Sequence, residues 1–167
     1  MEPFERPWFA TGLRVPRSVL NSVDDAARAA HPEESCGLLY GPADDPAAIT
    51  RAEPWDNLAN KYHALDPETY PRTARAAYIL HPMKMQRALE AGDARGEPVK
   101  VIFHSHCNVG AYFSHEDQTV AAPEGVPVVP VVYLVTSVRD GGLVDDHKLF
   151  AFDGGAWVER PLTVVEG

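Results

Sequence analysis

The sequence has few cysteines and no concentration of positive charge, and both features narrow what the protein can be. Cys36 and Cys107 are its two cysteines, and they form no CxxC pair, so we expect reduced thiols and no disulfide framework. Lys and Arg number 15 against 24 Asp and Glu, a net charge of −9. Because the basic residues are also scattered, the sequence offers no positive stripe for phosphates, and nucleic acid is not expected as a partner.

The sequence also lacks a segment typical of a membrane span or an export signal. The longest largely apolar run, residues 126–135, contains Pro127 and Pro130, whereas a membrane helix needs about 20 apolar residues. The opening residues, MEPFERPWFATG, include acidic residues where a signal peptide has basic ones, and no apolar stretch follows them. We therefore expect a cytoplasmic protein that is not bound to membranes.

The length and the 45% content of hydrophobic residues predict one globular domain with a single core, of α/β (α+β) class. Apolar periodicity predicts helices at residues 17–30, 82–91 and 114–122, the second ending before Gly92. Strands are predicted at residues 36–41, 48–53, 99–106, 128–137, 143–152 and 156–165, the first two as a hairpin. Prolines interrupt residues 54–81, which are expected to be mostly loop.

One short stretch contains a pattern typical of a metal site. His104-Ser-His106 is followed by seven residues, then Ser114, two more residues and Asp117. Side chains alternate along a strand, so the two histidines should face the same way, and Asp117 at the next helix adds a carboxylate. Two imidazoles and one carboxylate suit a catalytic zinc. Taken separately, Ser-x-x-Asp also resembles a capping box, and a His-x-His pair can be hydrogen-bonded surface residues.

The combined pattern resembles the motif of the JAMM (MPN+) zinc metallopeptidases: an upstream Glu, then H-S/T-H, seven residues, Ser, two residues and Asp. The segment HPEESCGLLYG at residues 31–41 is similar to the part of that family that leads from the first helix into a strand. This alignment places the catalytic Glu at Glu34, not Glu33. The resemblance covers about residues 13–160 and implies a single JAMM/MPN+ domain over residues 1–167, with a cytidine-deaminase-like mixed sheet flanked by helices.

The resemblance also implies a role for each motif residue. His104, His106 and Asp117 would hold one Zn²⁺ per chain, which lowers the pKa of its water toward about 7. Glu34 would take the proton from this water and deliver it to the leaving amine. Ser114 would stabilise the oxyanion and could cap its helix as well.

Cys107 stands where most relatives have Pro after the second His. Its thiol could be a fourth zinc ligand, a redox-sensitive modulator of the site, or an ordinary loop residue. We favour the loop residue, because adjacent residues of an extended chain point in different directions. Cys36 lies in a predicted buried strand and is expected to belong to the core.

The resemblance implies a substrate class as well. Stand-alone bacterial members look like peptidases or isopeptidases that act at the C-terminal glycine of ubiquitin-like sulfur-carrier proteins, including a cysteine adduct. Only residues 123–128 separate the motif helix from the next strand, so the insertion that grips a second ubiquitin in eukaryotic relatives is not expected. Two alternatives are a non-catalytic MPN scaffold, which should have lost metal ligands, and a JAMM processing enzyme in antiphage signalling or natural-product biosynthesis.

Residues 55–81 are the candidate segment for substrate docking. An extended carrier tail is most simply held by pairing with an exposed strand edge, and this segment is expected to supply that edge and its cover. Trp55, Tyr62 and Tyr70 would give apolar contact, and Lys61 or Arg72 could attract an acidic carrier. The alternative is a solvated loop that packs on the core through its aromatic side chains.

Overall fold

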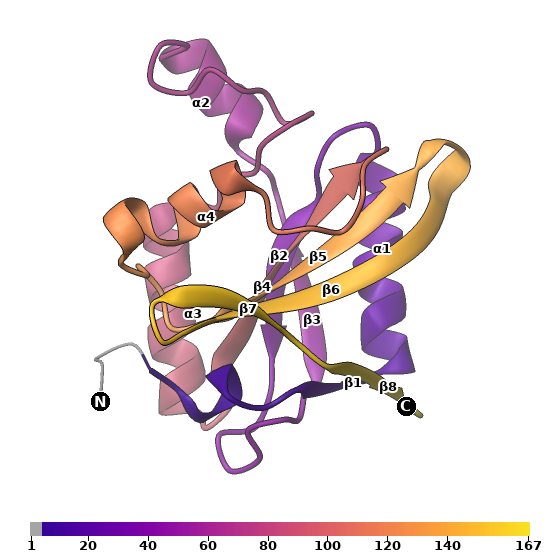
Figure 1. Ribbon diagram of the computed structural model, residues 1–167, viewed down its shortest axis with the longest axis vertical. Helices are drawn as coiled ribbons and strands as arrows, with labels where there is room; N and C mark the ends of the chain where they lie inside the picture. The colour runs from indigo at the N-terminus through magenta and orange to yellow at the C-terminus, as the bar shows by residue number, and fades with distance from the viewer. Residues whose placement is uncertain (1–4) are drawn as a thin grey trace.

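A six-stranded mixed β-sheet forms the centre of the computed structural model, which describes residues 5–167 (Figure 1). Residues 1–4, which begin the acidic opening segment, lie outside the described residues. The strand order is β3-β2-β4-β5-β6-β7, with β4 and β5 parallel and the other neighbours antiparallel. β1 and β8 form a separate parallel pair.

The strands are β1 (Leu13–Pro16), β2 (Cys36–Tyr40), β3 (Arg51–Trp55), β4 (Val99–Cys107), β5 (Val132–Arg139), β6 (Leu143–Asp153), β7 (Ala156–Arg160) and β8 (Leu162–Val165). The α-helices are α1 (Arg17–Ala30), α2 (Ala59–Leu65), α3 (Pro82–Ala94) and α4 (His115–Ala121). Short 3₁₀ turns occupy Pro7–Phe9, Pro123–Gly125 and Asp140–Gly142. Among the helices of the described chain, none combines the length and the apolar character that a membrane span requires.

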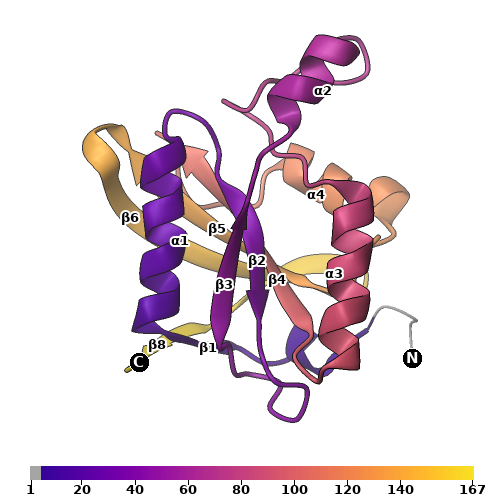
Figure 2. The same ribbon diagram turned by 180° about the vertical axis from the view of Figure 1, so that it is seen from behind.

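Helices cover both faces of the sheet. Figure 2 shows α1 on one side of the β2–β3 edge and α3 on the other. Val101 and Phe103 of β4 belong to the buried cluster that includes α1, whereas Ile102 belongs to the cluster that includes residues of α3 and α4. His104 and His106 continue the alternation of Ile102, so both point to the side of α3 and α4. The predicted common orientation of these two histidines is confirmed.

Several predicted elements agree with the structure. The helix at residues 17–30 is α1, the hairpin is the β2–β3 pair, and the motif helix is α4 with Ser114 as its N-cap. Cys36 lies in β2 and is buried, as expected. The mixed sheet flanked by helices confirms the predicted fold class.

The predicted end of the second helix is wrong. Helix α3 continues through Gly92 to Ala94, and the left-handed glycine that follows it is Gly96, with φ of 76°. Gly92 is present for a different reason. A Cβ at that position would lie 2.8 Å from the carbonyl oxygen of Glu97, so only glycine allows the chain to return this closely to the helix.

The C-terminal strand predicted at residues 156–165 is two strands in the structure. β7 pairs with β6, but the chain leaves that sheet at Pro161, which has no N–H to donate to a ladder. β8 then pairs with β1, a strand that apolar patterning did not reveal because it spans only Leu13–Pro16. This departure brings the C-terminal segment back beside the start of α1.

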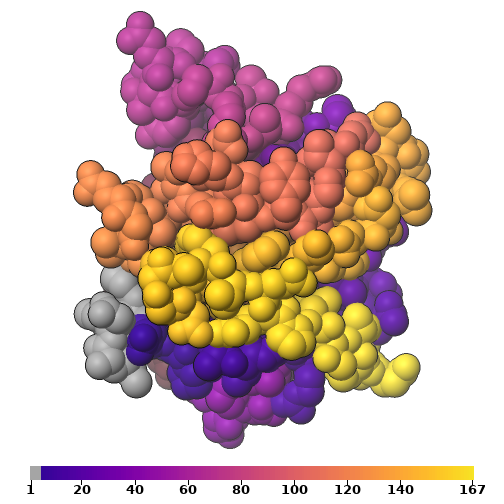
Figure 3. Space-filling model, viewed as in Figure 1, coloured from indigo at the N-terminus to yellow at the C-terminus, as the bar shows by residue number. Residues whose placement is uncertain are grey.

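The segment after Trp55 differs from its prediction. It contains α2, which was not predicted, and residues 56–81 of the described chain contain no strand, so the expected strand edge ends with β3 at Trp55. Figure 3 shows the α2 segment as a lobe that projects from the body of the molecule, next to the residues that follow β4. The side chain of Asn57 stabilises the start of α2, because its Oδ1 accepts a hydrogen bond from the N–H of Ala59, the first residue of that helix.

Lys100 is an unusual core residue, because its side chain is fully buried. Its Nζ donates to the carbonyl oxygens of Asp45, Ala48 and Pro46 at 2.8, 2.9 and 3.3 Å, and it thereby fastens the turn between β2 and β3 to β4. A buried ammonium is tolerated only when its donors are satisfied, and three carbonyls meet that requirement here.

We expect Lys100→Met to lower the free energy of unfolding by about 3 kcal/mol, since three buried carbonyls lose a charged donor while the volume is nearly kept. Urea denaturation followed by circular dichroism measures this change. Lys148→Met is the matched control on β6 and should change the stability by less than about 0.5 kcal/mol. Equal effects of the two substitutions would show that the three bonds of Lys100 contribute nothing.

Candidate metal centre

Two consecutive elements on one side of the sheet bring the metal-site candidates together. His104 and His106 are near the end of β4, and Asp117 is in the first turn of α4, within the connection from β4 to its parallel neighbour β5. Loops at the carboxyl ends of parallel strands are where ligands commonly bind in α/β sheets. All three residues are buried, with exposed fractions of 0%, 4% and 6%.

The three side chains converge tightly. Each offers a ligand atom within 4.8 Å of the other two. Oδ2 of Asp117 lies 3.2 Å from Nε2 of His104 and 3.0 Å from Nε2 of His106. The predicted triad is therefore assembled in space.

A capping box fixes the Asp117 carboxylate. Ser114 N donates to Oδ2 of Asp117 at 3.1 Å, and Asp117 N donates to Oγ of Ser114 at 3.0 Å. The structural interpretation of Ser-x-x-Asp is thus correct, and it holds the carboxylate against the two imidazoles at the same time.

The hydrogen bonding of His106 leaves one ring nitrogen available as a ligand. Its Nδ1 lies 3.1 Å from the carbonyl oxygen of Gly110, and since a carbonyl only accepts, Nδ1 carries the hydrogen in this contact. Its Nε2 lies 3.0 Å from Oδ2 of Asp117, and it becomes a ligand atom once a cation displaces the hydrogen of that contact. Such an outer contact is typical of histidines that bind metals, because it fixes the ring and its tautomer.

His104 is held by stacking instead. Its ring lies against Tyr78, with centroids 4.3 Å apart and planes 20° apart. Neither ring nitrogen of His104 makes a hydrogen bond within residues 5–167, although the ring is completely buried. Buried polar atoms normally have a partner, so an unbonded Nε2 that lies 3.2 Å from the Asp117 carboxylate fits a site that receives a cation.

The electrostatics of the triad agree with this fit. Burial would raise the pKa of Asp117, but the two imidazoles hold it well below its usual range, so Asp117 is a carboxylate. Burial lowers the pKa of His104, although Asp117 opposes this, and the ring is therefore neutral at pH 7. These are the protonation states that a divalent cation requires of those two ligands. Burial would lower the pKa of His106, but Asp117 and Glu34 raise it, so a cation has to displace a proton from this ring.

Glu34 lies beside the triad. Burial raises its pKa to about 8, with His106 and Arg72 opposing the shift and Asp117 adding to it. Its backbone is fastened on both sides, since Glu34 N donates to Ala74 O at 2.7 Å and Asn57 Nδ2 donates to Glu34 O at 3.0 Å. Its Oε1 is buried and has no hydrogen-bond partner in the described structure. Glu34 therefore has a carboxyl oxygen free for a ligand or a substrate.

Ser114 retains a donor for substrate. Its Oγ accepts from Asp117 N, and among the described residues its hydroxyl hydrogen has no acceptor. Ser114 lines a cleft of about 280 Å³ together with Glu34, His106 and Asp117. A group bound in this cleft can thus meet the carboxyl of Glu34 and the hydroxyl of Ser114.

The four predicted substrate contacts lie outside this cleft. Trp55 ends the edge strand, where its Nε1 donates to Glu53 Oε1 at 2.6 Å and the Lys84 ammonium lies over its ring. Tyr62 and Tyr70 pack edge to face and line a separate, largely apolar hollow of about 570 Å³. Lys61 is exposed on α2. Arg72, which was also predicted to attract an acidic carrier, does line the cleft, together with Arg75, Tyr112 and Glu116 among others.

Cys107 was predicted to be a loop residue. In the structure it is the last residue of β4, so the strand is one residue longer than predicted. Its Sγ donates to Glu33 O at 3.3 Å, and it is not part of the ligand group described above. Burial and the charges of Glu34 and Glu33 raise the pKa of the Cys107 thiol to about 11. It lines the cleft as a thiol of low intrinsic reactivity.

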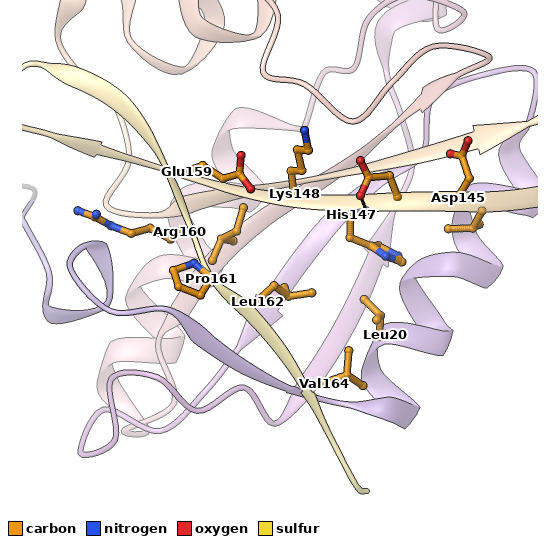
Figure 4. A pocket seen from close by; sticks show the side chains of 12 residues that line it. Leu20, Asp145, His147, Lys148, Glu159, Arg160, Pro161, Leu162 and Val164 are labelled. Carbon is orange, nitrogen blue, oxygen red and sulfur yellow. Dashed lines mark hydrogen bonds between the residues drawn. The ribbon is translucent and has the colours of Figure 1, made fainter.

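A hollow of about 450 Å³ lies elsewhere, between β6 and the departing C-terminal segment. Figure 4 shows Lys148 and His147 of β6 on one side and Pro161 and Leu162 on the other, with Leu20 of α1 beyond them. None of the predicted metal, catalytic or substrate residues lines this hollow. The metal candidates therefore belong to the smaller cleft.

Sequence reasoning missed the residues that set the position of Glu34. Ser105 Oγ accepts from Ser35 N at 2.8 Å, so the middle residue of His-Ser-His joins β4 to the residue after Glu34. Asn57 Nδ2 also donates to Ala77 O, and its Oδ1 accepts from Ile79 N as well as Ala59 N. Asn57 thus joins Glu34 to the segment that holds Tyr78. No local pattern signals these long-range partners.

Comparisons with known proteins agree with this arrangement. Residues 16–149 match the family model described as prokaryotic homologues of the JAB domain. The chain is 31% identical over 161 residues to a protein of Mycobacterium tuberculosis named CysO-cysteine peptidase, with 92% of each chain covered.

Solved structures show the same fold. A protein from Desulfitobacterium hafniense is 22% identical, with a TM-score of 0.70 and coverage of 93% of this chain and 94% of that one. A JAB1/MPN domain protein from Archaeoglobus fulgidus is 17% identical, with a TM-score of 0.54 and coverage of 93% and 100%.

We expect the purified protein to retain about one zinc ion per chain, because two imidazoles and a carboxylate suit that ion. His104→Ala and Asp117→Ala should each reduce the retained zinc to near zero after dialysis, as measured by elemental analysis. His147→Ala is the control, since His147 pairs with Asp24 on the far side of the sheet. A folded wild-type protein that neither contains nor takes up zinc would exclude the metal centre.

Asn57→Ala should lower the free energy of unfolding by about 2 kcal/mol or more, because four backbone groups lose their side-chain partner. Thermal and urea denaturation measure this loss. Asn60→Ala provides the comparison on the same segment, since exposed Asn60 bonds only Glu33 Oε2 and Ala74 N, and its effect should be smaller. A larger loss for Asn60→Ala would contradict the importance assigned to Asn57.

Proposed function

Because the chain belongs to the family of prokaryotic JAB domain homologues, we propose that it is a zinc-dependent JAMM peptidase acting after the C-terminal glycine of a ubiquitin-like sulfur-carrier protein. One observation carries this proposal: a buried His-His-Asp triad opens through His106 and Asp117 into a cleft that Glu34, with an unpartnered carboxyl oxygen, and Ser114 also line. The match over residues 16–149 supports treating the chain as one JAMM/MPN+ domain.

His104, His106 and Asp117 would hold the zinc ion. When bound, zinc supplies Lewis acidity that polarises the scissile carbonyl and makes water a nucleophile near neutral pH. The donor set fits it, because the unbonded Nε2 of His104 and the carboxylate of Asp117 would then gain a cation. The capping box and the Gly110 carbonyl orient Asp117 and His106 before the ion binds.

Glu34 acts as the proton carrier. Its free Oε1 accepts the proton of the attacking water, and the same carboxyl group then delivers that proton to the leaving amine. Burial raises its pKa to about 8 in the chain alone, and a cation held by the adjacent triad would oppose this shift and favour the carboxylate that the first step requires. The bonds from Glu34 N to Ala74 O and from Asn57 to Glu34 O keep the carboxyl in place through both transfers.

Ser114 stabilises the oxyanion. Its Oγ is held by the N–H of Asp117, so its hydroxyl hydrogen points to a position that the helix cap has already fixed. A donor that is oriented in advance loses little free energy to reorganisation when negative charge develops on the carbonyl oxygen.

The substrate class comes from the relative in M. tuberculosis, whose name states that it is a CysO-cysteine peptidase. We carry this over as a sulfur-carrier protein whose flexible tail enters the cleft. Tyr62 and Tyr70 line an apolar hollow, Lys61 lies on α2, and Trp55 ends the strand that precedes this helix, so these residues would contact the folded body of the carrier. Both cysteines are free, which supports action in the cytoplasm.

Glu34→Gln should retain zinc and fold but lower kcat about 100-fold or more, because an amide cannot accept the proton of the nucleophile. The test is hydrolysis of a sulfur-carrier protein extended by one residue beyond its C-terminal glycine, followed by mass spectrometry. Glu33→Gln is the matched control, since Glu33 bonds Asn60 and lies outside the cleft. If Glu33→Gln abolished activity and Glu34→Gln did not, the proton carrier would be Glu33 and not Glu34.

A further inference from the structure

Two arginines in the cleft form no ion pair with a carboxylate of the described residues, although the charge of Arg72 acts on Glu34. Six other arginines of this acidic chain form ion pairs with Asp or Glu, namely Arg14, Arg28, Arg51, Arg95, Arg139 and Arg160. Within residues 5–167, Arg72 donates only to the carbonyl oxygen of Ala76, at 2.6 Å, and the Arg75 side chain makes no hydrogen bond or ion pair. Both line the cleft that contains Glu34, His106 and Ser114.

Their position relative to Glu34 is fixed by the backbone. Ala74 lies between the two arginines in the sequence and is buried, and its carbonyl oxygen accepts from Glu34 N at 2.7 Å. The guanidinium groups therefore extend from a segment that is bonded directly to the residue carrying the proton. Asn57 strengthens this connection, because it bonds both Glu34 O and Ala77 O.

The structure of the leaving group indicates which part of the substrate would lie near Arg72 and Arg75. In the proposed reaction the C–N bond of the amide breaks, water adds its oxygen to the carrier glycine, and Glu34 delivers a proton to the departing nitrogen. The departing nitrogen must therefore lie beside Glu34. In an α-amino acid the carboxylate carbon is only two covalent bonds from that nitrogen, so a free carboxylate would fall on the side of the Arg72–Arg75 segment.

Arginine is suited to this task, because its planar fork binds a carboxylate through two parallel hydrogen bonds and stays charged at all working pH values. An internal peptide bond would place a neutral carbonyl there, and a lysine isopeptide would place an aliphatic chain there. Neither would provide a negative charge for the two guanidinium groups. The cleft of about 280 Å³ is also small, which leaves room for few atoms beyond the scissile bond.

We propose that Arg72 and Arg75 form a subsite for the free α-carboxylate of the leaving residue and thereby determine how strongly the enzyme prefers an acid over an amide at that position. This inference rests on the proposed peptidase function and names the residues that set its specificity.

The test compares two substrates that differ in one group: a sulfur-carrier protein extended at its C-terminal glycine by alanine, and the same protein extended by alanine amide. The zinc-loaded wild type should cleave the acid with a kcat/KM at least about tenfold above that for the amide, mainly through KM. Arg72→Gln and Arg75→Gln should each bring the ratio toward one, and Arg75→Lys should restore part of it. Arg87→Gln, on the exposed surface of α3, should keep the wild-type ratio.

Binding provides a readout that does not depend on turnover. In the Glu34→Gln background, calorimetry should give a Kd for the acid substrate about tenfold below that for the amide, and Arg75→Gln should remove this difference. Equal kcat/KM and equal Kd of the wild type for the acid and the amide would overturn the carboxylate subsite. So would arginine variants whose kcat/KM falls by the same factor for both substrates. Hydrolysis of neither substrate by the wild type would overturn the peptidase function itself.

Discussion

The buried carboxylate of Asp117 is the constraint on which the rest of the site depends. An ionised group with an exposed fraction of 6% is costly unless it is paired and hydrogen-bonded, and here one oxygen atom faces Ser114 N and both imidazoles. Satisfying that oxygen requires α4 to begin at Ser114 and β4 to end with its two histidines on the same face. The helix cap, the strand end and the candidate metal site are therefore one arrangement, and a change in any of them displaces the others.

The parts of this arrangement that local periodicity controls were predictable from the sequence. Alternation along β4 places His104 and His106 on one face, and the Ser-x-x-Asp spacing sets the start of α4, so the triad was expected. The mixed sheet was expected only from the resemblance to the JAMM family. Gly92 shows where such rules fail. A glycine after an apolar run is typical of a helix end, but here it serves the close return of the chain at Glu97, a contact between segments that the local pattern does not contain.

The environment of Glu34 could not be predicted for the same reason. The partners of its backbone are Ala74 and Asn57, and its neighbour Ser35 bonds Ser105, so residues far apart in the sequence set the position of one carboxyl group. The segment that supplies two of these partners is rich in proline and has one short helix, and its conformation depends on such side-chain bonds rather than on apolar periodicity. The cleft arginines belong to this segment, and of the predicted docking residues Arg72 reaches the cleft whereas Trp55, Lys61, Tyr62 and Tyr70 do not.

Some buried polar atoms of this fold lack hydrogen-bond partners at positions that function, and not stability, explains. Six buried side-chain atoms in the described residues have no hydrogen-bond partner, and three of them belong to His104 and Glu34. An orphaned buried polar group costs about 1–3 kcal/mol, so a chain selected only for stability would place apolar side chains at these positions. Two buried clusters, one on each face of the sheet, stabilise the fold enough to tolerate this cost. At His104 and Glu34 a bound cation and a bound substrate would supply the missing partners. Binding at this cleft should therefore stabilise the folded chain as well as prepare it for catalysis.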